Sequence, residues 1–383
     1  HLTLLAPVAD MGIQKDAAHR VVEKANALNK LLYGAHLLQE RTLRTVDLVH
    51  SFGERLSAVV LEAHLRQQGV SANAWMSDDA GLMVRGKHGF ALADLTATAE
   101  CFQKTVLPDL TENTVVLTGY FGRTREDAVM TLGRGGSDYS AGVAAFALDA
   151  QKLVVWKDVD GFMTADPRVV PQARRISRLT YKEAEELGAF GAKILHPKTM
   201  APLSAKKIPA EIRNVAFPQN VATLINGQEV ADGAVAKSVA MKPNASLLTI
   251  RGGSLLNVSS VAYPLFDRLQ EKDVPIDAIS TSQSDLSLCF EEKYLVPIRA
   301  ALKECNGTYA DVTAETEAAL LGLVGEGMRR HVGTSQRFFS ALAGAGVNVR
   351  MISQGASETN ITVAVSREDA DKALKAVHAE FLE

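Results

Sequence analysis

The chain has 383 residues, of which 47% are hydrophobic and 22% charged, so it is long enough for two or three globular domains and is not mainly disordered. Its net charge of −3 argues against a broad nucleic-acid or membrane surface, and no apolar run reaches the ~18 residues of a bilayer-spanning helix. The three cysteines, Cys101, Cys289 and Cys305, lie too far apart for a disulfide framework or a zinc site, which favours a reducing, cytoplasmic setting.

The first half of the chain alternates predicted helices with short apolar strands. Apolar side chains recur every three or four residues over 14–69, a spacing that predicts helix. Short apolar runs bounded by turn residues are typical of buried parallel strands, and they occupy residues 115–119, 153–156 and 209–215. Residues 216–233 are interrupted by proline and glycine, so we expect loops that close the first domain.

The second half contains an internal repeat. Residues 247–290 align without a gap on residues 320–363, so that Leu247 falls on Leu320. Each copy is predicted to form a strand, a helix and two further strands. Two copies are too few for a solenoid, so the pattern favours two small modules packed together, with chance similarity of two such modules as the alternative.

The sharpest motif is the glycine-rich segment 131–141, TLGRGGSDYSA. Glycines let the backbone approach a ligand, and a helix opening at Ser137 and Asp138 adds partial positive charge. Arg134 offers a two-pronged donor for a carboxylate or phosphate. The sequence therefore predicts an anion site here; the alternative is a glycine turn capped by Ser137 or Asp138.

Three further segments carry candidate chemistry. Residues 156–168, WKDVDGFMTADPR, follow a predicted strand and offer acids for Mg²⁺ or a ribose and Arg168 for phosphates, although Asp-Gly and Asp-Pro are also plain turn pairs. Residues 190–197, FGAKILHP, can bring the Lys193 ammonium to a phosphate, or form a loop with a solvated lysine. Residues 51–58, SFGERLSA, place Gly53 inside a predicted helix. A glycine there destabilises the helix by roughly 1 kcal/mol, so its presence indicates close packing or the approach of a ligand at this position.

Glu54, which follows that glycine, can receive a substrate ammonium. The alternative is a solvated helix glutamate beside Arg55.

Taken together and in this order, the four segments resemble the aspartokinases of the amino-acid kinase family, and the repeat resembles their paired ACT regulatory modules. The resemblance implies an α/β fold, an amino-acid-kinase sandwich with a largely parallel central sheet, followed by two ferredoxin-like (βαββαβ) ACT modules. It implies a catalytic domain over 1–233 and a regulatory region over 234–383. The modules would cover about 244–317 and 318–383, with 234–243 as candidates to join the second.

The resemblance also implies roles for individual residues. ATP and Mg²⁺ would be the cofactors, with the metal bound mainly through the phosphates and not by a protein metal site. The expected catalytic residues are Lys193, Asp138 and Arg134. The expected substrate-binding residues are Glu54, Arg134, Gly135, Gly136 and Ser137. The expected nucleotide-binding residues are Lys157, Asp158, Met163, Arg168, Lys193 and Ile194.

The implied reaction is phosphorylation of the side-chain carboxylate of L-aspartate to 4-phospho-L-aspartate, the first step of lysine, threonine and methionine biosynthesis. The ACT modules imply feedback by lysine or threonine and a homodimer formed through these modules, with neither nucleic acid nor membrane as a partner. The expected effector-binding residues are Asp277, Ser280, Thr281, Ser282 and Gln283.

The sequence departs from the family pattern in places. The usual opening Lys-Phe-Gly-Gly-Thr-Ser strand is not present, so we expect a chain that starts after this motif to be inactive or impaired. Lys157 stands where many relatives have Thr, Met163 where Tyr is frequent, and Gln283 where lysine-sensitive relatives often have Glu. Three other interpretations stay open: a different amino-acid or carbamate kinase, the kinase part of a bifunctional aspartokinase–homoserine dehydrogenase, and a catalytically impaired amino-acid sensor.

Overall fold

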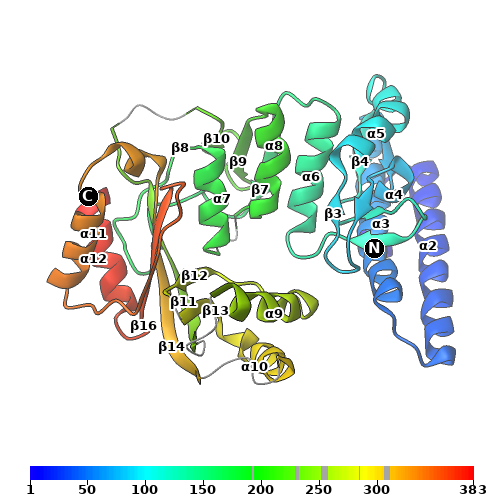
Figure 1. The fold of residues 1–383 in the computed structure, drawn as a ribbon. Helices are drawn as coiled ribbons and strands as arrows, with labels where there is room; N and C mark the ends of the chain where they lie inside the picture. The colour runs from blue at the N-terminus through cyan, green and yellow to red at the C-terminus, as the bar shows by residue number, and fades with distance from the viewer. Residues whose placement is uncertain (192–193, 229–232, 252–257, 284, 306–310) are drawn as a thin grey trace. The chain divides into compact units, whose positions relative to one another are not determined.

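The computed structural model describes residues 1–191, 194–228, 233–251, 258–283, 285–305 and 311–383 (Figure 1). These residues form two compact units. Unit 1 consists of His1–Val155 and Lys198–Glu211, and unit 2 of Trp156–Pro197 and Ile212–Glu383. The boundary that the resemblance implies after residue 233, between a catalytic domain and a regulatory region, stays a prediction.

Unit 1 begins with a helical hairpin. The helical region predicted over 14–69 consists of two helices, which separate where Gln39 adopts a left-handed conformation and Thr42 caps the second helix. The elements of unit 1 are α1 (Leu2–Leu5), α2 (Met11–Leu38), α3 (Leu43–Gln67), β1 (Ala72–Trp75), α4 (Ser77–Ala80), β2 (Val84–Arg85), β3 (Leu92–Ala93), α5 (Leu95–Leu110), β4 (Thr114–Leu117), β5 (Phe121–Arg123), β6 (Val129–Thr131), α6 (Gly136–Ala147) and α8 (Met200–Lys206).

The strands of unit 1 are short and only partly buried. β1 pairs in parallel with β4, whereas β2 with β3 and β5 with β6 form antiparallel pairs. Phe102 and Val106 of α5 pack with Leu132 and with Val143 of α6 in one apolar core. This core fixes α6, and therefore the glycine-rich turn that precedes it.

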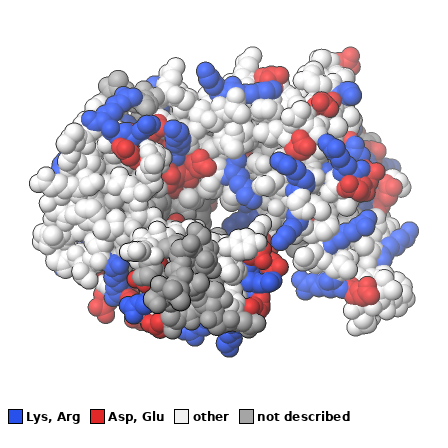
Figure 2. All heavy atoms as spheres, viewed as in Figure 1, with Lys and Arg blue, Asp and Glu red and all other residues white. Residues whose placement is uncertain are grey.

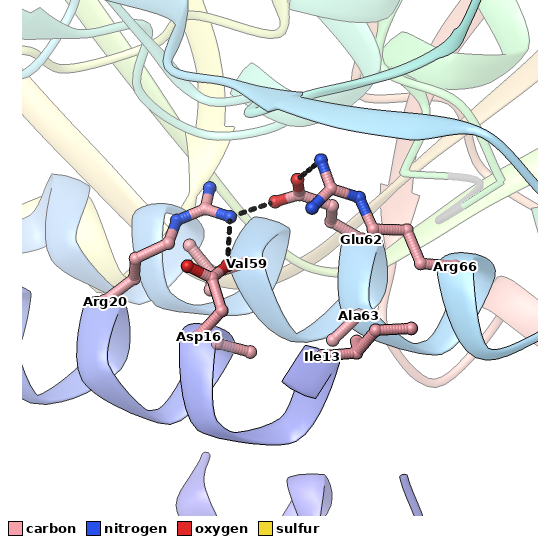
Figure 3. A pocket seen from close by; sticks show the side chains of 8 residues that line it. Ile13, Asp16, Arg20, Val59, Glu62, Ala63 and Arg66 are labelled. Carbon is pink, nitrogen blue, oxygen red and sulfur yellow. Dashed lines mark ion pairs between the residues drawn. The ribbon is translucent and has the colours of Figure 1, made fainter. Parts of the chain in front are cut away.

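A buried carboxylate fastens α2 to α3. Glu62 is only 2% exposed and lies 2.7 Å from Arg20 and 2.6 Å from Arg66 (Figure 3). Arg66 also donates to the Ala72 carbonyl and to the Asn73 side chain, at 2.7 and 2.9 Å. A buried charge needs such partners, so Glu62 joins both helices to the start of β1.

Unit 2 opens with a four-stranded sheet of order β7-β9-β10-β8. Its elements are β7 (Leu153–Lys157), β8 (Arg178–Leu179), α7 (Tyr181–Ala189), η1 (Pro197–Thr199), β9 (Ala210–Asn214) and β10 (Val221–Ile225). The unit boundaries fall inside β7, η1 and β9. The prediction of loops throughout 216–233 is wrong, because β10 is a strand that pairs in parallel with β8. Its apolar run is only five residues long and is flanked by Pro218 and Gly227, which hid it in the sequence pattern.

The repeat forms one six-stranded antiparallel sheet of order β12-β13-β11-β14-β16-β15. Both copies show the predicted order of strand, helix, strand, strand. The elements are β11 (Ser238–Arg251), α9 (Val258–Glu271), β12 (Ala278–Thr281), β13 (Asp285–Glu291), η2 (Glu292–Tyr294), α10 (Leu295–Glu304), β14 (Asp311–Val324), η3 (Glu326–Arg330), α11 (Thr334–Gly344), β15 (Met351–Ser353), β16 (Asn360–Ser366) and α12 (Ala370–Leu382).

The two long central strands, β11 and β14, serve both halves of this sheet (Figure 1). Residues 238–242 of β11 pair with 320–324 of β14, while 245–251 pair with both β13 and the first part of β14, and a bulge separates the two stretches. The edge strands β12 and β15 also meet, since the Ser353 hydroxyl donates to the Ile279 carbonyl at 2.9 Å.

Basic and acidic side chains lie near one another on the visible face of the molecule. Figure 2 shows such mixed groups beside a broad area at the left without charged side chains, and no large region of a single charge. Among the described residues, no helix has both the length and the apolar character needed to cross a bilayer.

Candidate functional site

The glycine-rich turn links β6 to α6 in unit 1. Gly133 has a φ of +75°, and a Cβ there would lie 2.8 Å from the Gly89 carbonyl oxygen. A Cβ on Gly136 would lie 2.8 Å from the Tyr120 ring. Both positions therefore require glycine, because a side chain would be strained or would clash. The helix predicted to begin at Ser137 begins one residue earlier, at Gly136.

Three side chains of this turn were predicted to act on the substrate. Arg134 is exposed and has no hydrogen bond or ion pair within the described part of the chain, and Ser137 is exposed in the first turn of α6. Asp138 is half-buried beside them. A guanidinium group at a helix N-terminus favours an anion, so this arrangement can hold a carboxylate.

A second tight turn, formed by residues 119–121, lies against the start of α6. Tyr120 has a φ of +75°, which non-glycine residues seldom adopt, and the Phe121 amide donates to the Gly119 carbonyl at 3.0 Å, which closes a γ-turn. A Cβ on Gly119 would lie 3.2 Å from Ser137 Cα. This turn was not predicted from the sequence, where its only sign is a glycine directly after the strand. Such strained backbone often marks a functional site.

Glu54 lies on α3 and is half-buried. Its neighbour Arg55 is engaged elsewhere, 2.5 Å from Asp78 and with its guanidinium 4.7 Å from the centre of the Phe121 ring. Glu54 has no polar partner within the described residues. A Cβ on Gly53 would meet no atom within 4 Å, so packing inside unit 1 does not explain that glycine. The other explanation, ligand approach at Gly53, stays a prediction.

The predicted nucleotide segment follows β7 in unit 2. Lys157 is half-buried and Asp158 is exposed. The Asn214 amide donates to Asp160 at 2.6 Å, and the Phe162 amide donates to the Thr223 hydroxyl at 3.0 Å. These bonds fasten the segment to the end of β9 and to the middle of β10.

Arg168 is bound to Asp166 in this structure. Its guanidinium donates to both carboxylate oxygens, with bonds of 3.0, 3.2 and 2.6 Å, and the Arg168 amide adds another of 3.0 Å. These bonds hold the pKa of the Asp166 carboxyl below its ordinary value. The Arg168 side chain is 87% exposed, so exchanging this carboxylate for a phosphate requires little rearrangement.

The end of the same segment is held by β11 of unit 2. The Ser238 hydroxyl of β11 donates to the Met163 carbonyl at 2.9 Å, and the Val239 amide donates to the Thr164 carbonyl at 2.8 Å. Met163 itself is half-buried. The position of the predicted nucleotide segment therefore depends on β11.

The third predicted motif follows α7. Lys193 lies outside the described residues, and Ile194 is half-buried. Phe190 packs closely over β14, because a Cβ on Gly322 would overlap its ring. The neighbouring Gly191 faces Lys242 of β11, whose Cε would lie 3.8 Å from an added Cβ.

The predicted effector residues lie directly before, within and directly after β12. The Asp277 carboxylate lies 2.6 Å from the Lys242 ammonium, with both side chains largely buried at 12% and 15% exposure. Burial raises the pKa of the Asp277 carboxyl, and Lys242 opposes that shift. Ser280 is half-buried. The exposed part of the segment comprises Thr281, Ser282 and Gln283.

Within the described ranges, no group of three or more His, Cys, Asp or Glu side chains is placed to hold a metal ion. The free acids near the nucleotide segment, such as Asp158, are oxygen ligands of the kind that Mg²⁺ accepts when phosphates supply the remaining positions. The donor set therefore fits a metal that arrives with a nucleotide.

Comparison with known families and curated proteins gives consistent matches. The model of the amino acid kinase family matches residues 6–214, and an ACT domain model matches 321–381. Aspartokinase 2, chloroplastic, of Arabidopsis thaliana is 34% identical over 95% of this chain and 69% of its own length. Aspartokinase 3 of that plant is 33% identical, with 66% of its length covered. The plant's bifunctional aspartokinase/homoserine dehydrogenase 1 is 32% identical, but only 41% of its length is covered.

Solved structures agree. The crystal structure of E. coli aspartokinase III in complex with aspartate and ADP, in the R-state, matches with a TM-score of 0.81 and 29% identity, over 96% of this chain and 82% of that one. The same enzyme in complex with lysine and aspartate, in the T-state, matches with a TM-score of 0.80 and 28% identity, over 99% and 84%.

Proposed function

The chain belongs to the aspartokinases of the amino acid kinase family, and on that premise we propose that it transfers the γ-phosphoryl group of ATP to the side-chain carboxylate of L-aspartate. The family resemblance and the fold class predicted from the sequence are confirmed. The products would be 4-phospho-L-aspartate and ADP, and the reaction would open lysine, threonine and methionine biosynthesis.

The observation that carries the proposal is the exposed, unpaired Arg134 on a turn that only glycines can form. The guanidinium group would bind a carboxylate of aspartate, with Gly135, Gly136 and Ser137 around it. Glu54, which also has no described polar partner, would receive the substrate ammonium. Asp138 would orient a basic group near the transferred phosphoryl.

The acceptor is a carboxylate, which is already a nucleophile at neutral pH, so the reaction needs no strong general base. Rate enhancement would come from positioning and from neutralising the charge of the transferred group. Lys193 would supply one positive charge. Mg²⁺ would arrive with the nucleotide and neutralise phosphate charge.

Lys157, Asp158, Met163, Arg168 and Ile194 would contact the nucleotide together with Lys193. One observation supports this assignment for Arg168: its exposed guanidinium is now bound to the half-buried carboxylate of Asp166, and a phosphate offers the same two-pronged geometry. Arg168 would exchange Asp166 for the nucleotide.

Feedback inhibition by an amino acid is the second part of the proposal. The E. coli relative is solved with lysine in its T-state, which supports lysine over threonine as the effector. The effector would bind Asp277, Ser280, Thr281, Ser282 and Gln283, and two copies of the chain would pair through the ACT modules. The match to bifunctional relatives keeps a fused homoserine dehydrogenase as an alternative.

The test is ATP- and Mg²⁺-dependent formation of aspartyl phosphate, trapped with hydroxylamine, with and without lysine and threonine. We expect turnover that lysine suppresses. Binding of an amino acid without turnover by the folded full-length protein would instead support the sensor interpretation. Turnover of another amino acid in a substrate panel would contradict the assignment of aspartate.

A further inference from the structure

One buried carboxylate near the glycine-rich turn has no role in the proposed chemistry. Asp47 of α3 is 1% exposed and accepts three hydrogen bonds. The donors are the Thr131 hydroxyl at 2.5 Å, His88 Nδ1 at 2.7 Å and the Gly89 amide at 3.0 Å. They come from two segments that are 42 and 84 residues away in sequence, so Asp47 ties three parts of unit 1 together.

Those two segments support the glycine-rich turn directly. Thr131 ends β6, two residues before Gly133, and its carbonyl accepts from the Ala91 amide at 2.9 Å. The Gly89 carbonyl fills the space that a side chain on Gly133 would need. The hydrogen bonds of the Asp47 carboxylate therefore fix the position of residues 88–91 against the turn that carries Arg134.

Glu54, the residue proposed to bind the substrate ammonium, lies on the same helix as Asp47. Asp47 and Glu54 are seven residues apart on α3, which is two turns, so both project from one face of the helix about 10 Å apart. The same face that anchors β6 through Asp47 thus presents Glu54. A shift of β6 against α3 would change the spacing between Glu54 and Arg134.

We propose that Asp47 is a positioning residue for aspartate binding, which acts by fixing the glycine-rich turn and Arg134 relative to Glu54. The inference rests on the proposed function of these two residues. Asp47 itself touches neither substrate nor nucleotide in this proposal, so its loss should change aspartate binding without changing nucleotide binding.

The same helix offers a matched control. Glu62 is 2% exposed and is held by Arg20 and Arg66, but its partners belong to α2 and to the end of α3 itself. Asp47→Asn and Glu62→Gln both remove one buried negative charge and keep the shape of the side chain. Both should lower stability, whereas only Asp47→Asn should alter the turn.

The experiment measures KM for aspartate, KM for ATP, kcat and the unfolding midpoint for the wild type and both variants. We expect Asp47→Asn to raise the aspartate KM about tenfold, the equivalent of one charge-assisted hydrogen bond, with the ATP KM unchanged. We expect Glu62→Gln to lower the midpoint with both KM values unchanged. An unchanged aspartate KM in Asp47→Asn, or an equal rise in Glu62→Gln, would overturn the inference.

A gentler variant covers the case in which Asp47→Asn does not fold. Thr131→Val removes one of the three donors and keeps the buried charge, and we expect it to raise the aspartate KM about threefold in the same selective way. An unchanged aspartate KM in Thr131→Val would overturn the inference as well. A wild-type protein that does not phosphorylate aspartate would instead overturn the proposed function, and this inference with it.

Discussion

Thr164 of the nucleotide segment and His378 of α12 share a hydrogen bond of 3.0 Å across 214 residues of sequence. The Thr164 hydroxyl also accepts from the Arg174 amide at 2.9 Å and keeps a proton that it can donate to Nε2 of a neutral His378. Burial favours this neutral imidazole. The hydrogen bond joins α12 to the segment proposed to bind ATP.

This bond predicts acid sensitivity. Burial lowers the pKa of His378, against the opposing effect of Glu383, while Arg174 lowers it further. A histidine with a lowered pKa in the folded state stabilises the protein above its ordinary pKa of ~6.5, and this stability is lost as the pH falls below that value. We expect the free energy of unfolding of the wild type to fall between about pH 7.5 and about pH 5, and His378→Gln to show a smaller fall.

Denaturant unfolding at both pH values measures this difference. His19→Gln is the control, since His19 is exposed on α2 and its replacement also removes one imidazole. Parallel pH dependence in the wild type and His378→Gln would contradict the prediction.

Gly53→Ala should separate stability from activity. An added Cβ on Gly53 meets nothing within 4 Å in the middle of α3, so alanine should raise the free energy of unfolding by about 0.5–1 kcal/mol. If the glycine exists for ligand approach, kcat/KM for aspartate should drop at the same time. Gly34→Ala in α2 is the matched control, because a Cβ there is equally unobstructed. It should stabilise without any kinetic change, and equal kinetics in both variants would rule out ligand approach at Gly53.

Arg134 should behave as a two-pronged ligand and not as a simple positive charge. Arg134→Lys keeps the charge but loses the paired donors, so we expect the aspartate KM to rise at least about tenfold, and Arg134→Ala to raise it further. The control is Arg125→Ala, which removes another exposed arginine of unit 1 without a described partner. Initial-rate kinetics with varied aspartate make the comparison, and full activity in Arg134→Lys would show that charge alone suffices.

Local patterns predicted the elements that carry the site, but not the contacts that support it. The helix after Arg134 and the strand that ends at Lys157 could be predicted from nearby residues, because glycines mark turns and short apolar runs mark buried strands. Asp47 gave no such sign, because its importance depends on donors from residues 88–89 and 131. Only the folded chain brings these residues together.

The internal repeat was likewise only partly predictable from the sequence. The alignment begins at Leu247 and so covers only the second part of β11. Residues 238–242, which pair with the other half of the sheet, have no counterpart within the aligned copies. In the structure the repeat extends further back than the sequence pattern shows, because β14 (Asp311–Val324) follows β11 (Ser238–Arg251) at the same offset of 320 − 247 = 73 residues.

The last prediction concerns the ion pair between Lys242 and Asp277, which connects the proposed effector segment to β11. Removing one partner leaves the other charge largely buried, so Lys242→Met should cost about 3 kcal/mol of unfolding free energy. Asp277→Asn should cost less, because burial already raises the pKa of that carboxyl and so already opposes its charge. The double variant should be more stable than Lys242→Met alone, since it leaves no charge unpaired.

Inhibition by lysine is the second property to measure on the same variants. Lys242 also packs near Gly191, directly before the stretch that carries Lys193, so a change at Asp277 has a short physical route to the proposed phosphate-binding motif. We expect Asp277→Asn to raise the lysine concentration needed for half-inhibition about tenfold or more, with the uninhibited rate largely kept. Lys272→Met is the control, because it removes a lysine that pairs with Glu304 at 2.8 Å outside the effector segment. Unchanged inhibition in Asp277→Asn would remove this residue from the effector site, because a coupling that survives loss of the charge does not pass through it.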